Sequence, residues 1–303
     1  MFIGTLTVQK EISTSISHED CLLQFSLQLF CSLMQEGKVV YKNNTIAYKK
    51  YGTGERYIIS FHGFGQAAYR WGILEPYLGN RFTLIAFDLP FHGDTQWNQK
   101  ENFTVEKLAE IIRQVLPNSN EKFYLLGYSM GGRIALRLLQ QIPKQIAKVV
   151  LLAPDGLHKN FWYRFATHTV VGRNLFYKSM KNPRLLFSIA KKLRARGALS
   201  KGQYDLAEYY VSNETSRMAI YNRWMGTRHF QPDLTLIRSL IVKHHIPVVL
   251  VFGKHDKIIV ADKGILFTKG LEKYATLKLL DTGHYFLRES YAPLIASYFD
   301  DDK

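Results

Sequence analysis

One serine of this chain lies between glycines at the junction of an expected strand and an expected helix. The run Gly127-Tyr128-Ser129-Met130-Gly131 follows the apolar segment 123–126 and leads into the helical segment 130–142. A sharp strand-to-helix turn exposes the serine hydroxyl, and the helix amino terminus adds partial positive charge that favours a developing anion. We therefore predict that Ser129 is a nucleophile. The alternative is a glycine-rich turn in which the serine is incidental.

A serine hydroxyl is a weak nucleophile at neutral pH, so it needs a base, and the base needs an orienting acid. His284 comes shortly after the apolar run 277–280 and is the predicted base. Asp256 comes shortly after the run 248–252 and is the predicted acid. This gives the chain order serine, acid, histidine, which is one of the orders known for such a triad. Asp155, at the end of another apolar run, is the alternative acid.

Two more titratable side chains lie next to the predicted acid and base. Asp281 is expected to end its strand as a structural residue, and His255 is expected to be a loop residue rather than a second base. Acyl chemistry also needs donors for a tetrahedral oxyanion. We expect these donors to be the backbone amides of Phe64 and Met130, with His62 as a hydrogen-bonding support and not a catalytic group.

The elements that must position these residues are short apolar runs alternating with helical segments. Runs of this kind suit strands that are buried on both faces of a parallel sheet. The expected strands are 57–61, 83–87, 123–126, 149–152, 248–252 and 277–280. The expected helices are 67–78, 104–116, 130–142 and 290–299. The alternation predicts an α/β protein with a doubly wound, mostly parallel sheet.

The alternation is interrupted by a helical, aromatic and basic stretch. We predict a core formed by 37–155 and 247–303, a helical lid at 156–246 over the carboxyl edge of the sheet, and a partly helical extension at 1–36. Residues 156–245 carry 16 Lys and Arg against 4 Asp and Glu, which is +12 of the chain's net charge of +15. This field favours an anionic small-molecule substrate or weak association with an acidic membrane surface; the alternative is a solvated helical face. The sequence contains no nucleic-acid-binding motif.

Composition excludes several classes of protein. The chain has 303 residues, of which 47% are hydrophobic, so it can bury a core and wholesale disorder is excluded. No apolar run approaches the roughly 18 residues that span a bilayer. The two cysteines, Cys21 and Cys31, would lie about 15 Å apart on one helix, so we expect free thiols in a reducing cytoplasm. Glu19 and Asp20 precede the apolar run where a secretory signal carries positive charge, and Met34 is a candidate natural start.

Several motifs together resemble one family. They are His62-Gly63-Phe64-Gly65, Asp88-Leu89-Pro90-Phe91-His92-Gly93, Gly127-Tyr128-Ser129-Met130-Gly131-Gly132, Gly253-Lys254-His255-Asp256 and Gly283-His284. In this order, at successive strand ends, they resemble the α/β-hydrolase superfamily over about residues 38–300. The overall pattern is most similar to lidded members: esterases, C–C bond hydrolases and menaquinone-pathway synthase-like proteins. Phe91 departs from the glycine that is usual in these relatives.

The resemblance implies a serine hydrolase that cleaves an ester or other acyl compound through Ser129, His284 and Asp256. The alternatives are a C–C hydrolase or lyase acting on a carboxylated ketonic substrate, and a non-catalytic binding protein on the same fold. No metal or organic cofactor is expected, because the motifs that hold them are missing from the sequence. Aromatic residues are the candidate substrate contacts: Phe64, Tyr128, Phe161, Trp162 and Trp224.

Overall fold

The computed structural model describes residues 34–118, 121–158, 160–197 and 213–300. The predictions for Cys21, Cys31 and nearly all of the extension 1–36 lie outside the described residues. Eight strands form one sheet in the order β1-β2-β4-β3-β5-β6-β7-β8. The strands are β1 (Gln35–Tyr41), β2 (Asn44–Tyr51), β3 (Arg56–Phe61), β4 (Phe82–Phe87), β5 (Phe123–Tyr128), β6 (Ile146–Leu152), β7 (Val248–Gly253) and β8 (Ala275–Leu280).

The sheet is mostly parallel, as predicted. Strands β3 to β8 pair in parallel, whereas β1 pairs with β2 and β2 with β4 in antiparallel fashion. All six predicted strands are present, and β1 and β2 were not predicted individually. Polar residues interrupt both of them, as in Asn44–Tyr51 of sequence NTIAYKKY, so neither contains an apolar run longer than three residues.

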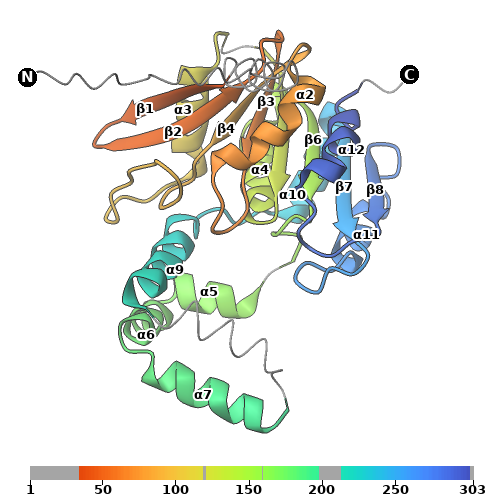
Figure 1. Ribbon diagram of the computed structural model, residues 1–303. Coiled ribbons are helices and arrows are strands. Elements are labelled where there is room, and N and C mark those ends of the chain that lie inside the picture. Colours follow the sequence, from red (N-terminus) through yellow and green to blue (C-terminus); the bar gives the residue numbers. More distant parts are fainter. Residues whose placement is uncertain (1–33, 119–120, 159, 198–212, 301–303) are drawn as a thin grey trace, which may run out of the picture. The chain divides into compact units, whose positions relative to one another are not determined.

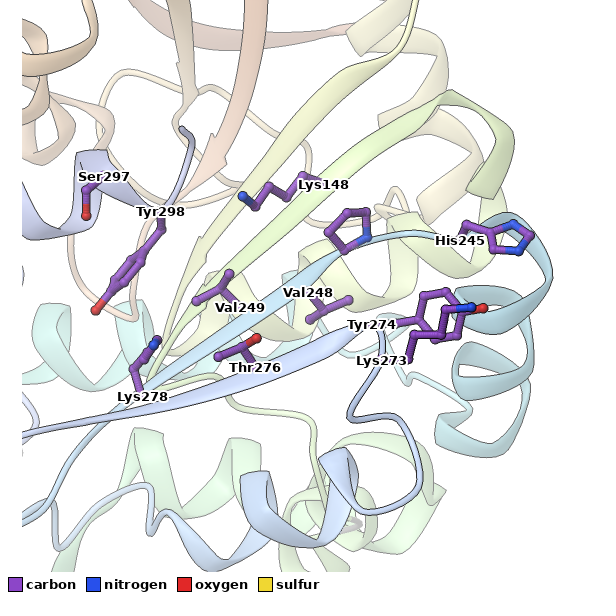
Figure 2. A pocket seen from close by; sticks show the side chains of 11 residues that line it. Lys148, His245, Val248, Val249, Lys273, Tyr274, Thr276, Lys278, Ser297 and Tyr298 are labelled. Carbon is purple, nitrogen blue, oxygen red and sulfur yellow. The ribbon is translucent and has the colours of Figure 1, made fainter. Parts of the chain in front are cut away.

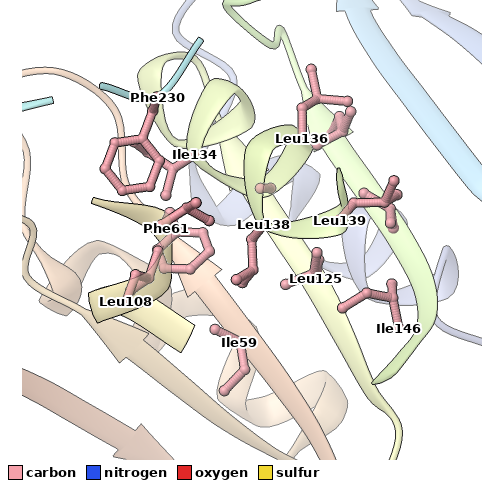
Figure 3. Close-up of a cluster of buried hydrophobic side chains, with 14 of the residues drawn as sticks. Ile59, Phe61, Leu108, Leu125, Ile134, Leu136, Leu138, Leu139, Ile146 and Phe230 are labelled. Carbon is pink, nitrogen blue, oxygen red and sulfur yellow. The ribbon is translucent and has the colours of Figure 1, made fainter. Parts of the chain in front are cut away.

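Helices cover both faces of this sheet (Figure 1). The core helices and turns are η1 (Ala68–Leu74), α2 (Glu75–Leu78), α3 (Val105–Val115), α4 (Met130–Gln141), η2 (Pro143–Gln145), α10 (Leu234–His244), α11 (Asp262–Thr268), η3 (Glu289–Tyr291) and α12 (Ala292–Ser297). One apolar layer packs α3, α4 and α10 on the sheet and contains Ile59, Leu125 and Leu138 (Figure 3). The other layer lies beneath η1, α2 and α12 and contains Trp71 and Phe299.

Four helices lie together beyond the carboxyl ends of the parallel strands (Figure 1). They are α5 (Phe161–His168), α6 (Val170–Lys181), α7 (Arg184–Ala195) and α9 (Glu214–Gly226). Side-chain oxygens cap three of them, because Asn160, Thr169 and Asn213 each accept a hydrogen bond from a backbone N–H of the first turn. Among the described helices, none is both long enough and apolar enough to cross a bilayer.

Helix α10 does not belong with these four, although the predicted lid, 156–246, includes it. It packs against α4, and its Ile237 and Ile241 are fully buried in the main apolar layer. Asp233 caps its first turn by accepting from Thr235 N and Leu236 N. The prediction missed this because 156–246 contains no buried strand that separates α10 from the helices before it.

Replacing Ile241 by Ala tests the assignment of α10 to the core. The side chain is 0% exposed, so we expect the substitution to lower the free energy of unfolding by about 2–5 kcal/mol, from lost burial and a residual cavity. Leu236→Ala on the same helix is the matched control, because that side chain is 43% exposed and should cost far less. Urea unfolding measures both. Equal losses in the two variants would contradict the assignment.

Candidate active site

The turn after β5 holds Ser129 in a strained conformation. Its φ of 50° and ψ of −115° lie outside the regions that a serine normally occupies. Helix α4 begins at the next residue, Met130, and packs tightly on the end of β3. A Cβ on Gly131 would lie 1.9 Å from the carbonyl oxygen of Phe61, so only glycine fits there. This close contact places the Ser129 turn directly beside the turn that follows β3.

A continuous chain of hydrogen-bonding atoms links three distant residues. His284 Nε2 lies 3.1 Å from Ser129 Oγ, and His284 Nδ1 lies 2.7 Å from Asp256 Oδ2. The other carboxylate oxygen of Asp256 accepts from Ile258 N at 2.8 Å and Ile259 N at 2.9 Å. The carboxylate is therefore fully used, and an Nδ1–H donated to it leaves Nε2 to accept the serine proton. The structure thus brings the predicted nucleophile, base and acid together.

Sheet topology explains why these residues meet. Asp256 and His284 lie on the loops after β7 and β8, which are parallel neighbours, so both loops emerge at the same edge of the sheet. The two loops are joined by a hydrogen bond from His255 N to Thr282 O at 3.0 Å. Tyr128 supports the imidazole from below: its hydroxyl donates to His284 O at 2.8 Å, and the two rings stack with centroids 5.5 Å apart.

The alternative acid Asp155 and the expected structural residue Asp281 both have other partners. Asp155, the alternative acid, accepts from Gly156 N through Oδ1 and lies 3.5 Å from Arg133 Nη1 through Oδ2. It is therefore directed at the guanidinium of Arg133, while Asp256 is the carboxylate that contacts the imidazole. Asp281 pairs with His255 Nε2 at 2.8 Å, and both of these side chains are largely exposed to solvent. This geometry suits the structural and loop roles expected for them.

The turn after β3 presents the backbone amide of Phe64 between two amides that are already used. Gly63 N donates to Gln66 Oε1 at 3.3 Å, and Gly65 N donates to His92 Nε2 at 3.1 Å. Met130 N belongs to the first turn of α4, where backbone N–H groups have no partner within the helix. Because the Gly131 contact holds the two turns together, both predicted oxyanion donors lie on adjoining segments.

Two buried histidines build the frame behind this turn. His62 lies next to Gly63, whose carbonyl is 2.8 Å from its Nδ1, and its Nε2 accepts from Leu89 N at 3.1 Å. Burial lowers the pKa of His62 to about 4, so the ring is neutral at pH 7. Burial also lowers the pKa of His92, with a further contribution from neighbouring His62. Neutral rings are required here, because a protonated imidazole has no acceptor for a backbone N–H.

A cavity of about 630 Å³ opens next to Ser129. It is lined by both core and lid residues, and its walls combine apolar side chains with a few polar groups. They include Phe64, Met130, Arg133, Asp155, Tyr163, Ile220, Trp224, Thr227, Leu234, Ile258 and Ile259. In size and lining it is suited to a small organic substrate.

The predicted substrate contacts divide into three groups. Phe64 and Trp224 line the cavity, and Tyr128 is buried beneath His284. Phe161 and Trp162 do not line the cavity: they are 69% and 74% exposed, and the neighbouring Tyr163 lines it. Helix periodicity explains this, because successive residues of α5 point in different directions.

Arg133 also lines the cavity and was not predicted from the sequence, although it lies one helical turn after Ser129.

A second cavity, of about 440 Å³, lies at the opposite edge of the sheet (Figure 2). It is lined by Lys148 of β6, Val248 at the start of β7, and Lys278 of β8, among others. Ser129, Asp256 and His284 follow the carboxyl ends of β5, β7 and β8, so this cavity is separate from the site. Within the described ranges, no group of three or more His, Cys, Asp and Glu side chains is arranged to hold a metal ion.

Comparison with known proteins agrees with this architecture. A sequence model described as the alpha/beta hydrolase fold matches residues 57–291, which is most of the chain. The chain therefore belongs to the α/β-hydrolase fold family, and it is an α/β-fold hydrolase, as its motifs predict.

The individual proteins that this chain resembles share only part of its sequence. The uncharacterized hydrolase YugF of Bacillus subtilis is 25% identical over 260 residues, covering 84% of this chain and 93% of that protein. A pimeloyl-[acyl-carrier protein] methyl ester esterase of Salmonella heidelberg is 31% identical over 110 residues, which are 36% of this chain and 41% of that protein. The solved structure of a thermophilic esterase from Thermogutta terrifontis has the same fold, with a TM-score of 0.61 and 18% identity over 87% of this chain and 96% of that one.

The buried neutral His62 predicts a specific loss of stability in acid. In the unfolded chain its imidazole binds a proton below about pH 6.5, whereas in the folded protein it does so only near pH 4. The unfolded state therefore binds more protons between these values, and the free energy of unfolding should fall as pH falls from 6.5 to 4, by on the order of 3 kcal/mol.

The variant His62→Gln measures this contribution. Gln Oε1 can replace the Nε2 acceptor but has no proton to gain in this range, so the slope of unfolding free energy between pH 6.5 and 4 should become smaller. Urea unfolding at pH 8 gives the packing cost of the substitution separately. Parallel pH curves for the variant and the wild type would contradict the assignment.

Proposed function

We propose that this protein hydrolyses an ester or other acyl compound through a covalent acyl-enzyme on Ser129. The observation that carries the proposal is the unbroken chain from Ser129 Oγ to His284 and on to Asp256, at 3.1 Å and 2.7 Å. It supplies the three parts that a hydroxyl nucleophile needs: the nucleophile, a base in contact with it, and an acid that orients the base. The positive φ of Ser129 adds to this, because a sharp strand-to-helix turn of this kind exposes the serine hydroxyl.

The mechanism follows from the positions of these groups. Ser129 Oγ bonds to the acyl carbonyl carbon while its proton passes to His284 Nε2, and the carbonyl oxygen becomes an oxyanion. The backbone amides of Phe64 and Met130 stabilise that oxyanion, and Asp256 stabilises the imidazolium. The imidazolium then protonates the leaving group as its bond to the acyl carbon breaks. Water, deprotonated by His284, attacks the acyl-enzyme and releases the acid and the free serine.

The proposed nucleophile and acid are tested by substitution. Ser129→Ala is expected to abolish labelling by a fluorophosphonate probe and to remove essentially all turnover of p-nitrophenyl esters, while the unfolding curve keeps its shape. Asp256→Asn should lower kcat by about 10⁴-fold, because the imidazole then adopts the wrong tautomer. Asp155→Asn, the matched control, should keep kcat within the same order of magnitude. Full activity in Ser129→Ala would overturn the proposed mechanism. A larger loss of kcat in Asp155→Asn than in Asp256→Asn would assign the role of the acid to Asp155 instead of Asp256.

The cavity indicates the class of acyl group. Arg133 is 6% exposed and lines the cavity that Ser129 shares, and its Nε has no hydrogen-bond partner in the described part of the chain. Its remaining contacts are Thr227 Oγ1 at 3.3 Å, the Tyr163 ring at 4.5 Å, and Asp155 at 3.5 Å. A buried guanidinium with a free donor beside the reacting centre favours a substrate with a carboxylate or a similar anionic group.

The charge of the neighbouring lid supports the same substrate class. Arg173 Nη1 donates to His168 O, and Arg228 Nη1 donates to Met225 O, so both of these hydrogen bonds go to neutral carbonyls. Burial lowers the pKa of Arg228, and Arg173 lowers it further. Burial also lowers the pKa of His229, as do Arg228 and other cations nearby. An anionic ligand would relieve this repulsion between the cations.

The alternative partner of these cations is an acidic membrane surface. If the protein binds such a surface, phosphatidylglycerol vesicles should activate it and phosphatidylcholine vesicles should not.

Two esters of equal chain length test the substrate class. The wild type should prefer mono-p-nitrophenyl adipate over p-nitrophenyl hexanoate, and Arg133→Met should lower kcat/KM for the adipate by about 10–100-fold with little change for the hexanoate. Arg137→Met, one turn further along α4, is the control. Equal losses on both esters, or a wild type without preference, would contradict the carboxylate assignment.

The C–C hydrolase alternative is tested with a carboxylated vinylogous diketone. The carboxylate of such a substrate would suit the same arginine, Arg133.

A further inference from the structure

Lid helix α9 makes a polar contact with the loop that follows β4. Arg223 Nε donates to the carbonyl oxygen of Phe91 at 3.1 Å. Phe91 has a φ of 65°, in the left-handed region that favours glycine and is costly for an aromatic residue. A side chain persists in that conformation only where surrounding contacts hold it.

The lid supplies such a contact for the Phe91 ring. A Cβ placed on Gly226 of α9 would lie 2.9 Å from ring atoms of Phe91, so the helix backbone and the ring are already in close contact. Gly226 lies three residues after Arg223, so both are on one face of α9. The helix is therefore joined to the loop twice, by a hydrogen bond to the carbonyl of Phe91 and by packing against its ring.

The same loop holds the proposed oxyanion turn. His92, the residue after Phe91, accepts from Gly65 N through Nε2, and the carbonyl of Pro90 lies 3.0 Å from its Nδ1. Arg223 also reaches that turn directly: its guanidinium lies 5.8 Å from the centre of the Phe64 ring, and its Nη1 would lie 3.6 Å from a Cβ on Gly65. One lid arginine thus contacts both the loop and the turn.

We propose that Arg223 is a positioning residue that couples docking of lid helix α9 to alignment of the Phe64 amide. The inference rests on the proposed function, because the amide matters only if an oxyanion forms beside it. When α9 is docked, Arg223 fixes the carbonyl of Phe91, His92 holds Gly65, and the turn between them presents its donor. When α9 moves away, the turn loses these restraints, although Ser129, His284 and Asp256 keep their own contacts.

Electrostatics agrees with this arrangement. Arg223 is half-buried, and burial lowers its pKa, but an arginine remains protonated at neutral pH. Its charge is one of the causes that lower the pKa of both His62 and His92, after burial. The cation thereby helps to keep both rings neutral, so that each can accept the backbone N–H that it holds.

A small substrate that does not fill the lid cavity isolates the effect. With p-nitrophenyl acetate, Arg223→Met is expected to lower kcat about tenfold with KM nearly unchanged, because a misaligned donor weakens the transition state and not the ground state. Fluorophosphonate labelling should slow, and binding of phenylboronic acid should weaken, each by about the same factor. Arg223→Lys, which keeps the charge and a donor, should recover part of the loss.

Two further variants separate positioning from a general role in lid stability. Lys181→Met removes the 2.6 Å ion pair between α6 and Glu214 of α9, and it should leave kcat for the acetate unchanged. Phe91→Gly removes the ring contact and should lower kcat less than Arg223→Met does. The double variant Phe91→Gly with Arg223→Met should lose less than the product of the two single losses, since both act through one loop.

The outcomes distinguish this inference from the proposed function. A wild type that is labelled and active, together with an Arg223→Met variant of unchanged kcat and boronate affinity, would overturn the inference alone. A loss in Lys181→Met equal to that in Arg223→Met would overturn it too, because any loosening of the lid would then suffice. A wild type that neither reacts with the probe nor turns over esters would overturn the proposed function and this inference with it.

Discussion

The contact between Gly131 and the end of β3 determines how the rest of the site is arranged. The carbonyl of Phe61 lies where a Cβ on Gly131 would have to be, so α4 approaches β3 more closely than any other residue would allow. Ser129, two residues before Gly131, has a positive φ, and the contact brings the proposed oxyanion turn beside it. The strain at Ser129 is sustained by β3 and β5, because the last four residues of each strand, next to this junction, are buried. The backbone conformation of this junction thus sets the orientation of the Ser129 hydroxyl, independently of the side chains that contact the hydroxyl.

A second constraint is that the frame behind the junction must stay uncharged. His62 and His92 each accept a backbone N–H through Nε2, from Leu89 and Gly65 respectively. Both depend on burial to keep the imidazole neutral, and Arg223 contributes to this from the lid. His284 is different, because its two nitrogens face a carboxylate and a hydroxyl instead of backbone groups. Three histidines near one turn therefore have different functions, which are set by their partners and not by their position in the sequence.

The fold and the meeting of Ser129, Asp256 and His284 could be predicted because both depend on local signals. Apolar runs marked the buried strands, and parallel strands bring the loops after their carboxyl ends to one edge. The lid lacked such signals. Phe161, Trp162 and Tyr163 are equally aromatic, and only the rotation of α5 selects Tyr163 for the cavity. Arg133 follows Ser129, the residue just before α4, by four residues, so it lies one turn along the helix and helical periodicity could have found it. Arg223 had no such signal, because its partners are distant in sequence.

The positions of the two arginines imply that the lid has two separable functions. Arg133 belongs to α4, so the positive charge in the cavity is supplied by the core, and the lid adds Tyr163 and Trp224 around it. Substitutions in those lid residues can reshape the cavity without disturbing Ser129. Arg223 is different, because it joins α9 to the loop that holds the proposed oxyanion turn. A lid helix tied in this way cannot be exchanged freely, since any replacement must also bond the carbonyl of Phe91 and leave room for its ring at Gly226. The face of α9 toward this loop is therefore more constrained than the lid residues that line the cavity.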